Sequence, residues 1–123
     1  MTARRESLEK AVARLEEALA APETAMNRDA TIQRFEFTFE LAWKAIQEVA
    51  RAQGLSCQSP KECLRLAFQQ EWITNEARWL AMLEDRNRTS HTYDETFAHA
   101  LYSRLPDYLE PLQRLTAFLQ REA

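Results

Sequence analysis

The residues best suited to chemistry lie together in one short stretch, residues 86–93, which read RNRTSHTY. Arginine is always charged, and its guanidinium fork matches the oxygen atoms of a phosphate group. Histidine titrates near neutral pH, so it can accept or donate a proton during a reaction. A fixed cation beside an imidazole and a phenol is therefore typical of a site that acts on phosphate groups.

Together these side chains could cleave RNA without a metal ion or other cofactor. A ribose 2′-hydroxyl would attack the adjacent phosphorus, His91 would move a proton, and Arg86 would hold the developing charge. Asn87 could orient the phosphate or the imidazole, and Arg88 could hold the RNA backbone. Tyr93 offers a hydroxyl group that another enzyme could modify.

Helix geometry limits how Arg86 and His91 can act together. On one continuous α-helix, residues five positions apart point about 140° away from each other around the axis. Either the helix ends before His91, or two copies of the chain complete one site. A purely structural alternative also stays open, because arginine and histidine at a helix C-terminus complement the helix dipole and cap free carbonyl groups.

The composition indicates an all-α fold. The chain has 123 residues, so we expect residues 1–123 to form one domain. It contains 1 Gly and 4 Pro and is rich in Ala, Leu, Glu and Arg, which favour helices. We find no run of alternating β-branched residues that would predict a strand.

Charge and hydropathy argue against two classes of protein. A formal net charge of -3 excludes a domain that attracts nucleic acid by its overall charge, so contact with RNA requires a local patch. No apolar stretch approaches the roughly 20 residues that span a bilayer, and the charged residues 1–10 do not resemble a secretory signal. We therefore expect a cytoplasmic protein that does not interact with membranes.

The spacing of apolar residues predicts two long helices before the motif. The first covers residues 2–20 and has apolar positions at steps of three and four. The second covers residues 28–53 with a similar stripe, and Phe37 and Leu41 form a second apolar patch beside it. A helix with two apolar faces is either central in its bundle or covered by a second subunit.

A third helix is expected over residues 60–70, and a fourth from Thr74 or Asn75 to Arg86. The last helix is expected to begin at the end of the motif, with Thr92 or Asp94 as its N-cap. Two prolines interrupt its apolar pattern and predict a kink or a short break near residue 105.

The sequence also predicts the state or location of several side chains outside the motif. Cys57 and Cys63 have no zinc-ligand spacing, so we expect two reduced, partly buried thiols. Asp85 should pair with a neighbouring arginine, and His99 should lie at the surface or between helices. The three tryptophans are expected in the core or a dimer interface rather than as a platform for stacking bases.

An ordered set of segments resembles a known family. The segments are IQRFE at residues 32–36, ELAWK at 40–44, SPK at 59–61, WLAML at 79–83, and then Arg86-Asn87, His91 and Tyr93-Asp94. In this order they resemble the nucleotidyltransferase substrate-binding proteins of the HEPN superfamily. The motif itself resembles the R-x4-H-x-Y motif of that superfamily.

This resemblance implies an antiparallel bundle of four to five helices that forms a homodimer. It also implies a separate partner, a minimal nucleotidyltransferase, in a toxin–antitoxin-like pair. Arg86 and His91 would be the catalytic pair of a ribonuclease toxin, and Tyr93 would accept AMP from the partner, which silences the toxin. The older family name implies only a non-catalytic subunit that binds nucleotide or docks the partner. Both functions stay open at this point.

Overall fold

The computed structural model describes residues 3–122, and in this range it contains five α-helices and one short 3-10 turn, with no strand. The elements are α1 (Ala3–Ala20), α2 (Ala25–Ala52), α3 (Pro60–Gln69), α4 (Glu76–Asn87), η1 (Thr89–His91) and α5 (Glu95–Arg121). The predicted all-α fold is therefore confirmed. The expected first residue of the first helix, Thr2, lies outside the described residues.

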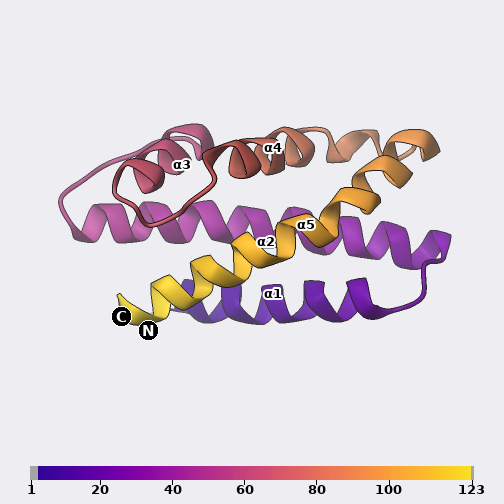
Figure 1. The fold of residues 1–123 in the computed structure, drawn as a ribbon, viewed down its shortest axis with the longest axis horizontal. Coiled ribbons are helices and arrows are strands. Elements are labelled where there is room, and N and C mark those ends of the chain that lie inside the picture. The colour runs from indigo at the N-terminus through magenta and orange to yellow at the C-terminus, as the bar shows by residue number, and fades with distance from the viewer. Residues whose placement is uncertain (1–2, 123) are drawn as a thin grey trace.

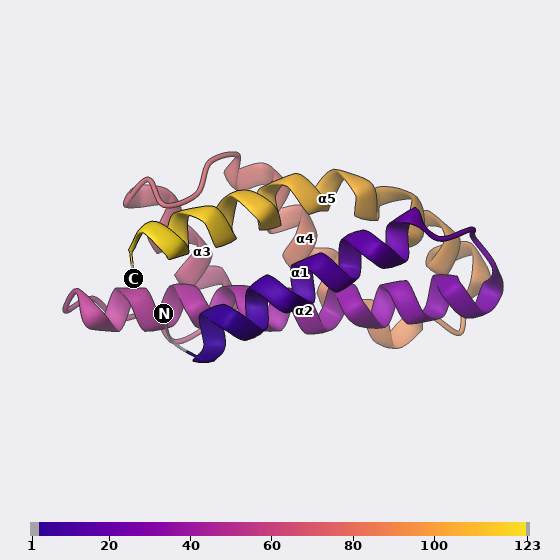
Figure 2. The same cartoon turned by 90° about the horizontal axis from the view of Figure 1, so that it is seen from below.

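The helix α2 is the central element. It packs against α1, α3, α4 and α5, and Figure 1 shows it running along the length of the molecule between α1 on one side and α3 and α4 on the other. Figure 2 shows α1 alongside α2, with both chain ends at the same end of the bundle. There Arg5 Nη1 donates a hydrogen bond of 3.2 Å to the carbonyl oxygen of Leu119.

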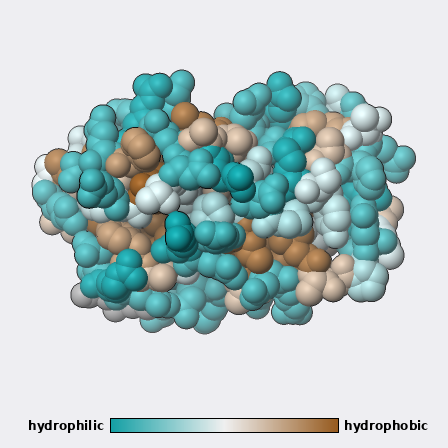
Figure 3. Space-filling view, viewed as in Figure 1, coloured by the Kyte–Doolittle hydropathy of each residue, from teal (hydrophilic) through white to brown (hydrophobic). Residues whose placement is uncertain are grey.

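The predicted apolar stripe of α2 forms the middle of the core. Phe35 stacks on Tyr108 with ring centroids 5.6 Å apart, and Phe39 meets Trp79 at 6.5 Å. Phe37, from the second apolar patch, lies outside the core and is 65% exposed. On the face drawn in Figure 3 apolar side chains gather in small, separate patches between hydrophilic ones.

Polar caps set the helix boundaries. The α2 helix begins at Ala25, three residues earlier than predicted, because the Thr24 side chain accepts a hydrogen bond from the backbone N–H of Asn27. Of the two candidate N-caps for α5, Asp94 is the actual one, and its carboxylate accepts from the N–H groups of Thr96 and Phe97.

Of the kink or short break predicted near residue 105, the break is wrong, because α5 continues from Glu95 to Arg121 through both prolines. The kink stays a prediction. Pro111 cannot donate to the carbonyl oxygen of Asp107, four residues earlier. Arg78 replaces that donor from α4, with its Nη1 at 2.8 Å from this oxygen. Buried leucines on both sides of the prolines keep the helix against the core.

The expectation of two free thiols is also wrong, because Cys57 and Cys63 form a disulfide. Both residues are buried, Cys57 in the connection before α3 and Cys63 in its first turns. Ser59 caps α3 by accepting from the N–H of Glu62, and this turn brings the two Cα atoms to 5.1 Å.

A buried carboxylate joins α4 to α5. Arg104 donates from Nε and Nη2 to the two carboxylate oxygens of Asp85 at 2.9 and 2.7 Å, and the Tyr108 hydroxyl donates to the same carboxylate at 2.6 Å. Asp85 pairs with an arginine as predicted, but the partner is Arg104, 19 positions away on α5, rather than an arginine beside it in the sequence. Because Asp85 directly precedes Arg86, this joint fixes the position from which the motif starts.

The Tyr108 hydroxyl should stabilise the fold in a pH-dependent way. Tyr108→Phe should lower the free energy of unfolding at pH 7 by about 1–3 kcal/mol, because the phenol donates to a charged group. Burial, and next the hydrogen bond to Asp85, raise the pKa of Tyr108 above its ordinary value. The stabilisation is therefore fully present below the unfolded-state pKa, which is about 10, and is lost as the pH rises through the folded-state pKa.

Urea unfolding followed by circular dichroism, between about pH 7 and about pH 11, tests this expectation. The difference between the wild type and Tyr108→Phe should narrow above about pH 10, by at most about 1.4 kcal/mol per pH unit. Tyr102→Phe is the matched control, on the same helix and half-buried. A difference that stays constant over the whole range would contradict the assignment.

Candidate functional site

The motif occupies the junction between two helices. The helix α4 ends at Asn87, Arg88 follows as its C-cap, and the turn η1 covers Thr89–His91. The chain therefore leaves the α-helix before His91, which is one of the two arrangements predicted from the spacing. The 140° separation of a continuous helix does not apply to Arg86 and His91.

Arg86 points toward α2. Its Nη2 forms an ion pair with the carboxylate of Glu40, and its Nη1 donates to Oδ1 of Asn87 at 3.0 Å. Glu40 also pairs with Lys44 at 3.8 Å, as the i,i+4 spacing suggests. The Arg86 side chain is 26% exposed, so the cation is held in one orientation but remains accessible to a ligand.

Thr89 anchors the turn that carries the histidine. It is a buried polar residue, and its hydroxyl lies within hydrogen-bonding distance of the Glu36 carboxylate. The same hydroxyl is 2.9 Å from the carbonyl oxygen of Arg86. One hydroxyl proton can serve only one of these acceptors at a time. In either case the contact ties the turn to α2 or to the end of α4.

His91 and Tyr93 lie on the exposed side of the junction. The Tyr93 hydroxyl is 3.5 Å from Nδ1 of His91, and the two rings meet edge to face with centroids 6.0 Å apart. Tyr93 is 81% exposed. Arg88 is also exposed, and its guanidinium lies 3.6 Å from the Glu84 carboxylate. These groups are open to a large ligand or a modifying enzyme.

The structure thus brings the motif residues together as two groups. Arg86 and Asn87 line an open cleft of about 620 Å³ against α2, together with Glu36, Phe37, Glu40, Thr89 and Ser90. His91 is not among the described residues that line this cleft. Within residues 3–122, no hydrogen bond joins Arg86 to His91.

Three contributors to this site are residues to which sequence reasoning gave no role: Glu36, Glu40 and Thr89. Both glutamates lie in the segments of α2 that carry the family resemblance, and this resemblance was the one sequence feature that marked their positions. Their partners, however, lie 46 and 53 positions away along the chain. Spacing within one helix cannot reveal such contacts.

The described residues form neither a metal-binding cluster nor a membrane-spanning helix. Within residues 3–122, no group of three or more His, Cys, Asp or Glu side chains is placed to hold a metal ion. None of the helices in this range is long and apolar enough to cross a bilayer.

Comparison with known proteins assigns this arrangement to a family. Residues 3–121 match the model of a family described as nucleotidyltransferase substrate binding protein like. The chain belongs to this family. The resemblance noted in the sequence is therefore confirmed over almost the whole chain.

Individual relatives agree with the family. The chain is 35% identical over 83 residues to a Haemophilus influenzae protein named probable ribonuclease HepT, a match that covers 63% of this chain and 57% of that protein. The match thus spans little more than half the length of that relative.

Two solved structures share the fold. A crystal structure from Thermus thermophilus has a TM-score of 0.86 and 40% identity, covering 91% of this chain and 98% of that one. A Haemophilus influenzae structure has a TM-score of 0.84 and 26% identity, covering 94% and 98%. The latter is described as revealing the fold of a substrate binding domain of a nucleotidyltransferase.

The contact between Thr89 and Glu36 should hold the turn in place. Thr89→Val keeps the shape of the side chain but removes the hydroxyl, so we expect a loss of about 1–3 kcal/mol in the free energy of unfolding. In this variant, amide hydrogen exchange of residues 89–94 should also accelerate relative to the wild type, and by more than the exchange of α1 does. Urea unfolding and exchange mass spectrometry measure the two effects. Thr92→Val, in the same junction, is the control, and equal behaviour of both variants would refute the anchoring role.

Proposed function

We propose that this family member is the toxin subunit of a two-component system with a minimal nucleotidyltransferase, and that it cleaves RNA without a metal ion. The observation that carries the proposal is the junction itself, where an oriented arginine and an exposed histidine flank one short turn. The family description, nucleotidyltransferase substrate binding protein like, supports the nucleotidyltransferase partner. The name of the 35% identical relative supports the ribonuclease activity.

In the proposed reaction, the 2′-oxygen of a ribose attacks the adjacent phosphorus and the bond to the 5′-oxygen breaks. His91 takes the proton of the 2′-hydroxyl, and the leaving oxygen receives a proton from solvent. Arg86 stabilises the negative charge that develops on the phosphate oxygens. Asn87, bonded to Arg86, and the exposed Arg88 would hold the phosphate and the RNA backbone.

We further propose that a homodimer completes the active site. One chain keeps Arg86 in the cleft against α2 and His91 outside it. A second copy, related by a two-fold axis near the junction, would bring its histidine to the arginine of the first. The exposed Phe37 ring lines the same cleft and gives the second copy an apolar surface to cover.

We also propose Tyr93 as the residue through which the partner silences the toxin. Its hydroxyl is exposed and lies beside the imidazole of His91. Transfer of AMP would join the phenolic oxygen to the α-phosphorus of ATP and release pyrophosphate. The added phosphate and base would occupy the space that RNA needs in order to reach His91.

One observation favours the alternative of a non-catalytic subunit that binds nucleotide or docks the transferase. Two carboxylates, those of Glu36 and Glu40, line the cleft with Arg86, and Glu40 is already paired with it. An RNA phosphate can bind Arg86 only if it displaces Glu40 or shares the guanidinium with it. If neither happens, the cleft only positions the junction for binding to the nucleotidyltransferase.

Replacement of His91 is the decisive test of catalysis. His91→Ala should reduce RNA cleavage by about 100-fold or more in the presence of a chelator, because the proton transfer is lost. The matched control is His99→Ala, since His99 is the other of the two histidines and pairs with Glu23 outside the motif. Cleavage of a labelled RNA on denaturing gels gives the rates. Equal cleavage by wild type and His91→Ala would refute the proposal.

Mixing two inactive variants distinguishes a site within one chain from a shared one. Arg86→Ala and His91→Ala subunits, unfolded and refolded together, should regain about a quarter of the wild-type rate if the pair comes from two chains. The estimate assumes random assembly, in which half of the dimers are mixed and each has one intact site. No recovery, with mixed dimers present by native mass spectrometry, would place the site within one chain.

AMP transfer tests the role of Tyr93. Incubated with ATP and its nucleotidyltransferase, the wild type should gain the mass of one AMP per chain and lose its ribonuclease activity. Tyr93→Phe should gain no mass and stay active, because it lacks the acceptor oxygen, whereas Tyr102→Phe should behave like the wild type. Intact-protein mass spectrometry measures the transfer, and modification of Tyr93→Phe would exclude Tyr93 as the acceptor.

A further inference from the structure

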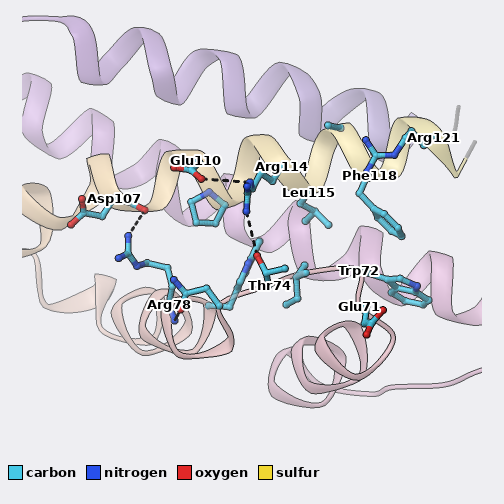
Figure 4. A pocket seen from close by; sticks show the side chains of 15 residues that line it. Glu71, Trp72, Thr74, Arg78, Asp107, Glu110, Arg114, Leu115, Phe118 and Arg121 are labelled. Carbon is cyan, nitrogen blue, oxygen red and sulfur yellow. Dashed lines mark hydrogen bonds and ion pairs between the residues drawn. The ribbon is translucent and has the colours of Figure 1, made fainter.

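A cavity of about 530 Å³ lies on a part of the molecule that includes none of the motif residues 86–93. Figure 4 shows its walls, which are the connection between α3 and α4, the first turn of α4, and the C-terminal half of α5. Its volume is in the range of small-molecule sites. Its two ends have different chemical character.

One end is aromatic. Trp72 and Phe118 stack with ring centroids 6.0 Å apart and an angle of 26° between the ring planes. Both side chains are half-buried, so each keeps some surface toward the cavity. Such faces bind flat aromatic groups, and nucleobases above all, by stacking. Arg121 lies on the same wall, as Figure 4 shows.

The other end carries two arginines, Arg78 in the first turn of α4 and Arg114 of α5, which contacts Thr74 just before α4. Arg114 donates to Oγ1 of Thr74 at 3.4 Å, and its carboxylate partner is Glu110 at 3.5 Å. The side chains of that pair are 68% and 75% exposed, so the pairing is weak and easily exchanged. Arg78 donates to the neutral backbone carbonyl of Asp107, so this contact does not pair the guanidinium directly with a carboxylate.

The carboxylates around the cavity restrict what it can bind. Glu71, Asp107 and Glu110 offset the charge of Arg78, Arg114 and Arg121, so the cavity has no net field that would attract a long polyanion. Binding must come from specific contacts with a small molecule. A compound with a flat base at one end and a phosphate at the other matches both ends of the cavity.

We propose that this cavity binds a nucleoside monophosphate. The base stacks against Trp72 and Phe118, and the phosphate lies between Arg78 and Arg114 at the N-terminus of α4, where the helix dipole also favours an anion. The site is separate from the proposed ribonuclease site, because the two share no residue. Its existence does not depend on RNA cleavage.

Isothermal titration calorimetry of the full chain with AMP and UMP tests the proposal. Ribose 5-phosphate probes the phosphate end of the cavity and adenosine probes its aromatic end. Each should bind at least tenfold more weakly than AMP. Arg114→Gln should weaken AMP binding at least tenfold by removing the phosphate contact. Trp72→Leu should weaken it about tenfold by removing the stacking surface, and Trp72→Phe should restore most of the affinity.

Two controls isolate the cavity. Arg14→Gln removes an exposed arginine of α1 outside the cavity and should bind AMP like the wild type. His91→Ala should also bind AMP normally, so the loss of ribonuclease activity and the loss of nucleotide binding are distinguishable. Circular dichroism establishes that each variant keeps its helices, and the Trp72 pair provides the test if Arg114→Gln does not fold.

Three results would overturn the proposal. They are no saturable binding of AMP or UMP by the wild type, equal affinity for AMP and ribose 5-phosphate, and unchanged affinity in folded Arg114→Gln and Trp72→Leu. The second result would mean that the cavity holds only an anion.

Discussion

The carboxylate of Asp85 determines how the two helices that flank the motif meet. It is buried and accepts hydrogen bonds from the Arg104 guanidinium and the Tyr108 hydroxyl, so its charge is compensated on both sides. Removing one partner of such a buried charge leaves the other uncompensated, which typically costs about 3–5 kcal/mol. Because the motif begins at the next residue, its geometry depends on this joint rather than on its own short turn.

The pairing of Arg86 with Glu40 has two opposite effects. It removes rotational freedom from a long side chain, so less entropy is lost when a phosphate binds. It also neutralises part of the charge that a phosphate would meet. Since the Arg86 side chain is 26% exposed, a bidentate phosphate can still approach the guanidinium. Phosphate binding at the proposed site would therefore depend on orientation more than on the strength of the electrostatic field, in keeping with a chain whose net charge is -3.

Much of the fold could be predicted from the sequence, because helix periodicity and caps act over a few residues. The stripe of α2, the Ser59 cap of α3 and the end of α4 before His91 all follow from such local rules. The position of the candidate site was predictable for the same reason. Its supporting contacts were not, since Glu40 and Arg86 come from different helices, and no local rule brings them together.

The continuity of α5 also shows that local sequence rules do not predict contacts between different helices. Two prolines inside a helix are a strong local signal for a break, yet Arg78 of α4 supplies a hydrogen bond to the Asp107 carbonyl that Pro111 leaves without its donor. This contact and the Asp85 joint tie α4 to α5 near both of its ends. With both ends fixed, α4 cannot bend independently of α5.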